Sequence, residues 1–288
     1  MPDNNQKTFC RARLPVFCAL AAAITSVQAD TLLDEPLSLS ERSPLSQHFN
    51  LPAMRGGALL APGSMQWRMG VDVANNFVHA ANADERFDLD GESQRYELGV
   101  RYGVGERWEV GVMVPWIAYN GGALDSFIED WHRLWGFSAG NRNNYPRGQL
   151  RFSYQRNGRT EFVFDSAEAG FGDVQVQVAN RVFQSDRDSV ALIATLNLPT
   201  GDEHKLTGAG GTSAGVQLAV THAGLLDLPL TLSANLGAQT LPKGDVLSDR
   251  QKSTAWFGGG EIAWAPVPDW RWRAQVNMHS ALYDSALT

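Results

Sequence analysis

Apolar and polar side chains alternate along most of the chain after residue 64. The clearest example is residues 92–116, because a period of two places each set on one face of a pleated strand. Its apolar positions are Tyr96, Leu98, Val100 and Tyr102, and then Trp108, Val110, Val112, Val114 and Trp116. Gly103 to Glu106 separates the two runs. The pattern predicts a β-hairpin with one apolar face and one charged face.

The apolar face of this hairpin carries aromatic rings at both of its ends. Tyr102 and Trp108 flank the turn, Trp116 lies at the far end, and aliphatic side chains lie between them. An aliphatic band bounded by amphipathic rings is typical of a strand that crosses a lipid bilayer. A half-buried hairpin of a soluble sandwich is the alternative for this stretch alone.

The same alternation recurs to the end of the chain and predicts about eleven strands. Short turns and longer polar loops alternate between them, as in outer-membrane barrels, whose short turns face the periplasm. This rule places Trp67, Tyr102, Trp108, Trp264 and Trp270 at one rim, and Phe77, Trp116 and Trp256 near the other. We therefore expect residues 64–288 to form an all-β, transmembrane, antiparallel up-and-down β-barrel.

The expected number of strands is odd, whereas bacterial single-chain barrels have an even number. Either a weak strand, such as residues 160–165, is miscounted, or strands are missing at the C-terminal end. We expect the second, with twelve or fourteen strands in the complete barrel.

A long outer loop is expected at residues 118–147, and it contains one helical pattern. Apolar side chains recur there at spacings of three and four residues, which predicts an amphipathic helix over about 126–136. Ser126 and Glu129 fit a capping box at its start. The helix could fold into the mouth as a lid, with Phe127, Trp131 and Trp135 facing inward, or lie flat on the outer rim.

The first 29 residues have the layout of a secretory signal peptide. Three basic residues precede an apolar run from Leu14 to Val27, and Val27 to Ala29 is a small-residue cleavage site. Residues 30–63 carry four prolines without sustained alternation and are expected to form an irregular leader, either periplasmic or folded into the lumen. Both cysteines lie in the signal peptide, so the mature chain has no disulfide or thiolate metal site.

Net charge argues against one class of partner. The whole chain has a net charge of -7, and removal of the signal peptide makes it two units more negative. An acidic surface disfavours nucleic acid as a partner. The remaining expected partners are outer-membrane lipid, the barrel-assembly machinery and a small-molecule solute of unknown identity.

Charged side chains on the alternate positions are expected to line the lumen. The candidates are Arg68, Asp72, Arg95, Glu97, Arg101, Glu109, Arg151, Glu261, Arg271 and Arg273. The strands between Val190 and Gln239 have no charge on their inward positions. This arrangement could select polar solutes through a transverse field, or its charges could neutralise one another as an internal ion-pair network.

The sequence gives little support to an enzyme. His79, His132 and His204 are expected in outer loops, but none lies in a recognisable nucleophile motif. Asp202, Glu203 and His204 could ligate a metal, although adjacent polar residues are more often a loop tip. We therefore predict no catalytic residue, no metal and no cofactor.

Several short motifs resemble those of one family. They are Pro44-Leu45, Asn50 to Ala53, Trp108 to Gly111, Gly170 to Asp173 and Leu198 to Asp202. Together they resemble an uncharacterised family of gammaproteobacterial outer-membrane β-barrels, a domain of unknown function. The last two motifs are also similar to barrels for uptake of aromatic or hydrophobic compounds. The resemblance implies a barrel in the outer membrane of a Gram-negative bacterium, and members that continue beyond residue 288.

The function expected from these patterns is a passive channel or uptake barrel for small molecules. A non-conducting structural or adhesive barrel, whose loops bind a partner, is the first alternative. An outer-membrane enzyme is the second. The transported solute and the oligomeric state cannot be read from the sequence.

Overall fold

The computed structural model describes residues 35–138, 142–267 and 270–285. The twelve strands within these residues form one antiparallel sheet. They are β1 (Met65–Ala81), β2 (Glu85–Val104), β3 (Trp108–Asn120), β4 (Arg151–Arg156), β5 (Arg159–Phe164), β6 (Glu168–Phe171), β7 (Val174–Gln184), β8 (Asp188–Leu198), β9 (Ser213–Ala223), β10 (Leu230–Thr240), β11 (Thr254–Val267) and β12 (Trp270–His279). The expected signal peptide, residues 1–29, lies outside the described residues.

Nine of these strands follow one another in the sheet, in the order β1, β2, β3, β7, β8, β9, β10, β11 and β12. The other three pair with the ends of earlier strands: β4 with residues 85–90, β5 with β4, and β6 with residues 116–119. In the described residues β1 pairs only with β2, and β12 only with β11. The fold is therefore all-β, antiparallel and up-and-down, as predicted, and the sheet is open along β1 and β12.

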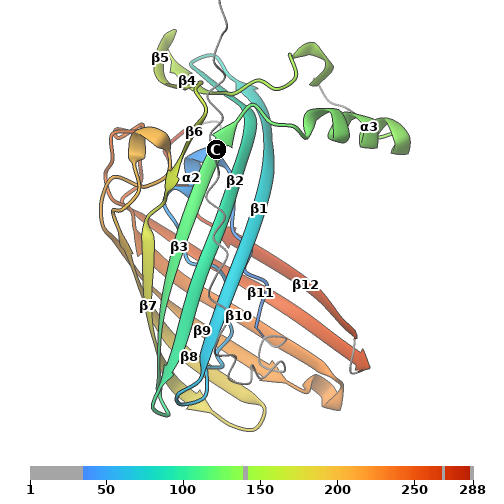
Figure 1. The fold of residues 1–288 in the computed structure, drawn as a ribbon, viewed down its shortest axis with the longest axis vertical. Helices are drawn as coiled ribbons and strands as arrows, with labels where there is room; N and C mark the ends of the chain where they lie inside the picture. The colour runs from blue at the N-terminus through green and yellow to red at the C-terminus, as the bar shows by residue number, and fades with distance from the viewer. Residues whose placement is uncertain (1–34, 139–141, 268–269, 286–288) are drawn as a thin grey trace, which may run out of the picture.

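The two ends of the sheet differ in the length of their connections (Figure 1). We call one the turn end, where residues 105–107, 185–187 and 224–229 join consecutive strands. We call the other the loop end, where β4, β5, β6 and residues 199–212 and 241–253 lie. This difference agrees with the predicted alternation of short and long connections, except between β1 and β2, where residues 82–84 form a short connection at the loop end.

The two faces of the sheet divide the apolar from the polar side chains. On β8, for example, Leu192 and Leu196 are exposed on the outer face, whereas Thr195 and Asn197 are buried on the inner face. The predicted hairpin is confirmed in register, with Tyr96 opposite Trp116 and Tyr102 opposite Val110.

Residues 80–91 are largely polar, but they form the ends of β1 and β2, with residues 82–84 as the turn between them. Gly91, with φ +149, lies where β2 continues beyond the paired part of β3, and a Cβ there would lie 2.8 Å from Leu150 Cδ1. A residue with a Cβ would be strained at this φ and would also lie too close to Leu150. Glycine is therefore the residue that fits here easily. The polar residues 85–90 on the loop-end side of Gly91 are in a strand because β4 pairs with them.

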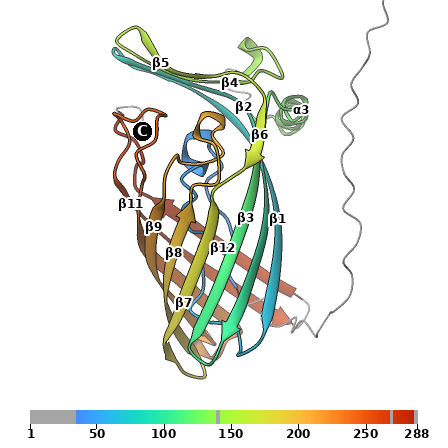
Figure 2. The same ribbon diagram turned by 60° about the vertical axis from the view of Figure 1, so that its left-hand side comes forward.

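The leader, residues 35–63, lies inside the curled sheet (Figure 2). Its short helix α2 (Pro44–Gln47) begins with a proline, which is favourable because the first helical N–H has no partner within the helix. The leader was expected to be either periplasmic or folded into the lumen, and in the structure it lies on the lumen side. The leader therefore takes up much of the space that a simple channel would leave open.

Helix α3 (Asp125–Trp135) matches the predicted helix to within one residue, but its start and its position correct two expectations. The capping box does not form, because the helix begins at Asp125 and Ser126 lies inside its first turn, and Glu129 pairs with Arg147. The helix projects outward from the loop end (Figure 1). Phe127, Trp131 and Trp135 are therefore exposed and do not face the mouth, contrary to the predicted lid.

The position of α3 has a local cause at its N-terminus. Asp125 accepts hydrogen bonds from Asn75 Nδ2 (3.0 Å) and from the main-chain N–H of Gly148 (2.7 Å), and it pairs with Arg142. These contacts hold the first turn against β1. No helix in the described residues is long and apolar enough to cross a membrane.

Candidate functional site inside the sheet

Residues 35–41 run along the inner face of β12 and parallel to it. Alternate side chains of β12 bind alternate residues of this segment, so the contacts form a ladder. The pairs are Arg273 with Glu35, Gln275 with Leu37, Asn277 with Leu39 and His279 with Glu41, each 238 residues apart. In the first three pairs the side chain on β12 donates to a main-chain carbonyl of the leader, so the ladder holds the backbone of the leader.

Asn50 anchors the leader to the wall opposite β12. Its Nδ2 donates to the carbonyl of Asp173 (3.0 Å) and to Asn197 Oδ1 (3.1 Å), and its Oδ1 accepts from Arg95 (2.6 Å). Gln175 Nε2 donates to its carbonyl (3.0 Å). The residue has φ +51, a conformation that asparagine tolerates better than most residues. These contacts fix the point at which the leader turns after α2.

Asp173 links the same point to the loop after β8. Its two carboxylate oxygens accept main-chain hydrogen bonds from Gly201 and Ala209, both 2.9 Å long. Thr200 Oγ1 donates to the carbonyl of Gly172 (2.8 Å). Burial raises the pKa of Asp173, although these main-chain donors stabilise its charged form. Two of the short motifs in the sequence, residues 170–173 and 198–202, are therefore one structural unit.

Charged side chains gather between the leader and the inner faces of β1, β2, β3, β11 and β12. They form three groups, each with as many arginines as carboxylates. The first group joins Arg42 to Asp72 (2.6 Å) and Glu97 (3.4 Å), and Arg95 to Glu97 (2.6 Å). The second joins Arg55 to Glu109 (2.8 Å) and Glu35 (4.0 Å), and Arg101 to Glu35 (2.9 Å) and Glu109 (3.4 Å). The third joins Arg273 to Glu261 (3.6 Å).

Most of the residues predicted to line the lumen lie on this inner face. They are Arg68, Asp72, Arg95, Glu97, Arg101, Glu109, Glu261 and Arg273, and Arg271 lies on the same face of β12 as Arg273. Glu35, Arg42 and Arg55 in the leader also belong to these groups and were not predicted from the sequence. Period-two alternation identifies charges on strands, and the leader has no such period.

Arg151 is the exception, and its expected inward orientation is wrong. It is exposed at the start of β4, opposite Asp90, whereas its neighbour Phe152 is fully buried. The cause is that β4 pairs with β2 beyond Gly91, above the charged groups. There the apolar positions of β4 turn inward and the polar ones outward.

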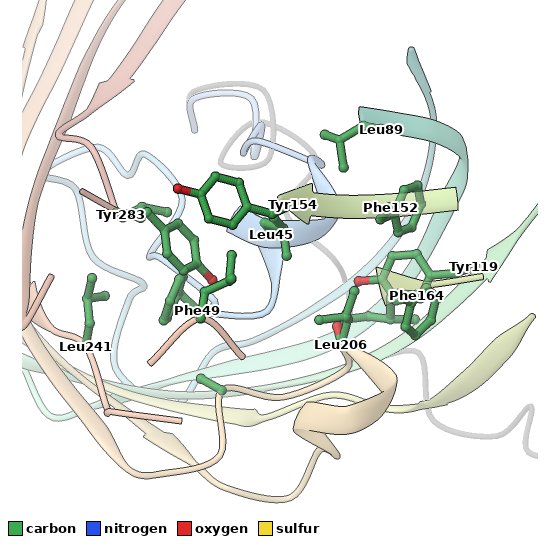
Figure 3. Packing of buried hydrophobic residues seen from close by; sticks show 14 of the residues in the cluster. Leu45, Phe49, Leu89, Tyr119, Phe152, Tyr154, Phe164, Leu206, Leu241 and Tyr283 are labelled. Carbon is green, nitrogen blue, oxygen red and sulfur yellow. The ribbon is translucent and has the colours of Figure 1, made fainter. Parts of the chain in front are cut away.

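Apolar side chains fill the loop end of the interior (Figure 3). Leu45 and Phe49 of the leader contribute, together with Tyr119, Phe152 and Tyr283 from the surrounding segments. We call this cluster the cap. Tyr119 donates to the carbonyl of Leu206 (2.8 Å) and accepts from Gln47 (2.9 Å), which satisfies its hydroxyl.

His48 lies buried beside the cap. Its Nδ1 is 3.2 Å from the carbonyl of Pro44, and its Nε2 is 3.3 Å from the hydroxyl of Tyr283. Burial lowers the pKa of His48 to about 4, so the ring is neutral at pH 7. The neutral tautomer donates to Pro44 and accepts from Tyr283.

Two cavities lie beside the leader. The first, about 300 Å³, lies between the leader and the inner faces of β1, β2 and β3. The second, about 450 Å³, lies between the leader and the inner faces of β10, β11 and β12. Both are within or near the volume range of small-molecule sites.

Comparison with protein-family models shows the family to which the chain belongs. A model described as a protein of unknown function (DUF3187) matches residues 13–287. The chain belongs to this family. A search of curated proteins found no match. The match covers all of the strands and the leader, so the interior described above belongs to the family domain.

His79 does not form a hydrolase triad with Ser153. His79 contacts Asp88 (2.8 Å), and Asp88 is directly opposite Ser153 on the next strand. Asp88 thus lies between the two. A triad needs the histidine beside the hydroxyl, so this order does not activate Ser153.

Three possible metal ligands lie together at the loop end, and they differ from the set considered in the sequence, for which no metal was predicted. Ligand atoms of Glu203, His204 and Asp245 lie within 4.8 Å of one another. Asp202 instead accepts a hydrogen bond from the main-chain N–H of His204 (2.9 Å). Glu203 already accepts one from Asp245 (2.9 Å), so part of its capacity is in use.

Proposed function

We propose that the protein is an outer-membrane β-barrel that gives small molecules a passive route across the membrane. The observation that carries the proposal is the outer face of the sheet, which is apolar and exposed while the inner face is polar. Residues 1–29 would direct the chain to secretion as a signal peptide.

The exposed apolar side chains of the outer face support the proposal that lipid surrounds the sheet. Met69 is 84% exposed, Leu236 65% and Val71 67%, although each is a large apolar side chain. Aromatic side chains on this face include Trp67, Trp108, Trp264, Trp270 and Trp272 toward the turn end, and Trp116, Phe171 and Trp256 toward the loop end. Such a surface is unfavourable in water and favourable in a bilayer with rings at its two boundaries.

The proposal requires that the sheet closes in the membrane. Unpaired main-chain groups along β1 and β12 would each cost several kcal/mol in hydrocarbon, so a barrel without edges is the stable form there. The polar inner residues and the two cavities would then form the route. The leader must shift for a solute to pass, because it lies within that route.

A non-conducting barrel is the second candidate, and the interior favours it in one respect. The charged groups pair with one another, and the cap fills the loop end. An interior of this kind would be a rigid support for the loops. The two candidates share the membrane location and differ in permeability.

The location is tested by folding the chain into lipid vesicles and comparing boiled with unboiled samples by electrophoresis. A barrel migrates differently in the two, and a chain that stays soluble without detergent and shows no shift would exclude the location. Permeability is tested by the swelling of these vesicles in small sugars and amino acids. Swelling faster than in vesicles containing heat-denatured chain supports passage, and equal rates favour the non-conducting barrel.

A further inference from the structure

One arginine beside the first cavity has no carboxylate within ion-pair distance. Arg68, on the inner face of the edge strand β1, is exposed and makes no hydrogen bond and no ion pair within 4.0 Å among the residues that the structure describes. The three groups of charges beside it are each balanced, as described above. Arg68 therefore adds one positive charge to an otherwise neutral set.

The same cavity of about 300 Å³ contains a second unmatched donor. Arg55 Nη2 binds Glu109, but Arg55 Nε is buried without a hydrogen-bond partner in the described structure. The Arg55 side chain is only 9% exposed. A buried donor without an acceptor is unfavourable, and an anion in the cavity would supply one. Arg55 and Arg68 both line this cavity.

Part of the remaining wall of the cavity is apolar, and Leu51, Met54 and Met113 contribute to it. The carboxylates Glu35 and Glu97 also line the cavity, and each is already paired with an arginine. A ligand that matches both parts has one negative charge and a short apolar chain. A carboxylate suits the planar guanidinium, because the two can form paired, charge-assisted hydrogen bonds.

We propose that this cavity binds a small organic monoanion, a carboxylate with an apolar tail, through Arg68 and the free N–H of Arg55. As a statement about the transported solute, the inference rests on the proposed function. Binding itself does not require that the solute passes through.

The test is equilibrium dialysis of labelled octanoate against the full chain in lipid nanodiscs, with empty nanodiscs as the blank. We expect saturable binding of one octanoate per chain, with no competition from 1-octanol. The Arg68→Gln variant should bind at least about tenfold more weakly, because it loses a charge-assisted contact. Arg107→Gln, which removes an exposed arginine of the β2–β3 turn, is the matched control and should bind as the wild type does.

A second variant tests the cavity without changing its charge. A Cβ on Gly99 would meet no atom closer than 3.6 Å, so Gly99→Leu can fold and place its side chain in the cavity. It should block octanoate. Gly260→Leu adds the same volume on the outer face of β11, where a Cβ meets nothing closer than 3.9 Å, and should not.

The outcomes separate this inference from the proposed function. Unsaturable binding, or equal binding by Arg68→Gln and Arg107→Gln, overturns the site. Saturable binding that Arg68→Gln and Gly99→Leu both weaken supports it. Swelling of vesicles that contain the same variants decides passage independently, and the electrophoretic shift on boiling verifies that each variant has folded.

Discussion

Glu109 is the residue on which two arginines of the interior depend. It is 1% exposed, pairs with Arg55 and Arg101, and also accepts the main-chain N–H of Leu60 (3.0 Å). Loss of its charge would leave two buried guanidinium groups with less compensation. Removal of one partner from a buried pair is strongly destabilising.

We expect Glu109→Gln to lower the free energy of unfolding by about 3 kcal/mol. Urea titration of the chain folded in lipid vesicles measures this. Asp227→Asn is the control, because its pair with Arg187 is largely exposed and should contribute less than about 1 kcal/mol. Equal effects of the two substitutions would show that the Glu109 pair is not a buried one.

His48 makes stability depend on pH. Its pKa is about 4 in the folded chain and about 6.5 when unfolded, so the unfolded state binds more protons between these values. Stability should therefore fall as the pH is lowered from 6.5 to 4, by about 3 kcal/mol from this residue. Above pH 6.5 the contribution is constant.

The measurement is the free energy of unfolding against pH for the wild type and His48→Gln. The substitution should remove about 3 kcal/mol of the loss between pH 6.5 and 4, whereas His204→Gln, at an exposed loop position, should leave it unchanged. Parallel curves for the wild type and His48→Gln would mean that the ring is not buried.

Single residues were predictable from sequence where one rule decided their orientation. Period-two alternation gave the inward side of Arg95, Glu97 and Glu261, because each lies within a long, regularly paired strand. It failed for Arg151, because the direction of β4 depends on which part of β2 it pairs with. That choice depends on contacts remote in sequence, including those around Gly91.

Among the elements, the leader shows what the sequence could not reveal. Its partners on β12 lie 238 residues away, and it has no periodic pattern of its own. The two locations considered for it could therefore not be separated by local rules. The strands were predictable because each repeats one simple pattern.

The ladder between the leader and β12 should limit permeability. We expect the double variant Gln275→Ala with Asn277→Ala to speed both vesicle swelling and trypsin cleavage after Arg42. The variant loses two hydrogen bonds to the leader backbone, and each contributes about 1 kcal/mol to holding the leader in place. Val276→Ala with Met278→Ala changes the outer face of the same strand and is the control. Unchanged rates in the first variant would mean that the ladder does not hold the leader.

Helix α3 should have no effect on passage, because it lies away from the mouth. Trp131→Ala with Trp135→Ala is expected to leave the rate of vesicle swelling unchanged in every solute. A rise in rate would support the lid that the sequence suggested and contradict the exposed position of these rings. Arg133→Ala, on the polar face of the helix, serves as the comparison.

At the scale of the whole molecule, the sheet reverses the usual distribution of side chains. Aliphatic and aromatic residues cover the outside, and glutamines, asparagines, arginines and carboxylates occupy the inside. This reversal was predictable, because alternation and ring position are local properties. The number of strands was predicted less well, since the short β6 has only four residues and no clear alternation.

The cap was not predicted at all. Its residues come from the leader, β2, β3, β4, β5, β11 and the loops after β8, β10 and β12, and none of these segments alone indicates the others. A sequence pattern indicates which face of a segment can pack against another surface. They do not describe which distant segment supplies that surface.

The constant offset between residues 35–41 and β12 has a mechanical consequence. A force directed lengthwise along the strand would strain all four rungs simultaneously, since they are aligned side by side across the direction of motion. Lifting one end sideways would instead break them singly, each at a low force. The leader thus resists being drawn straight out and peels easily toward the centre of the molecule.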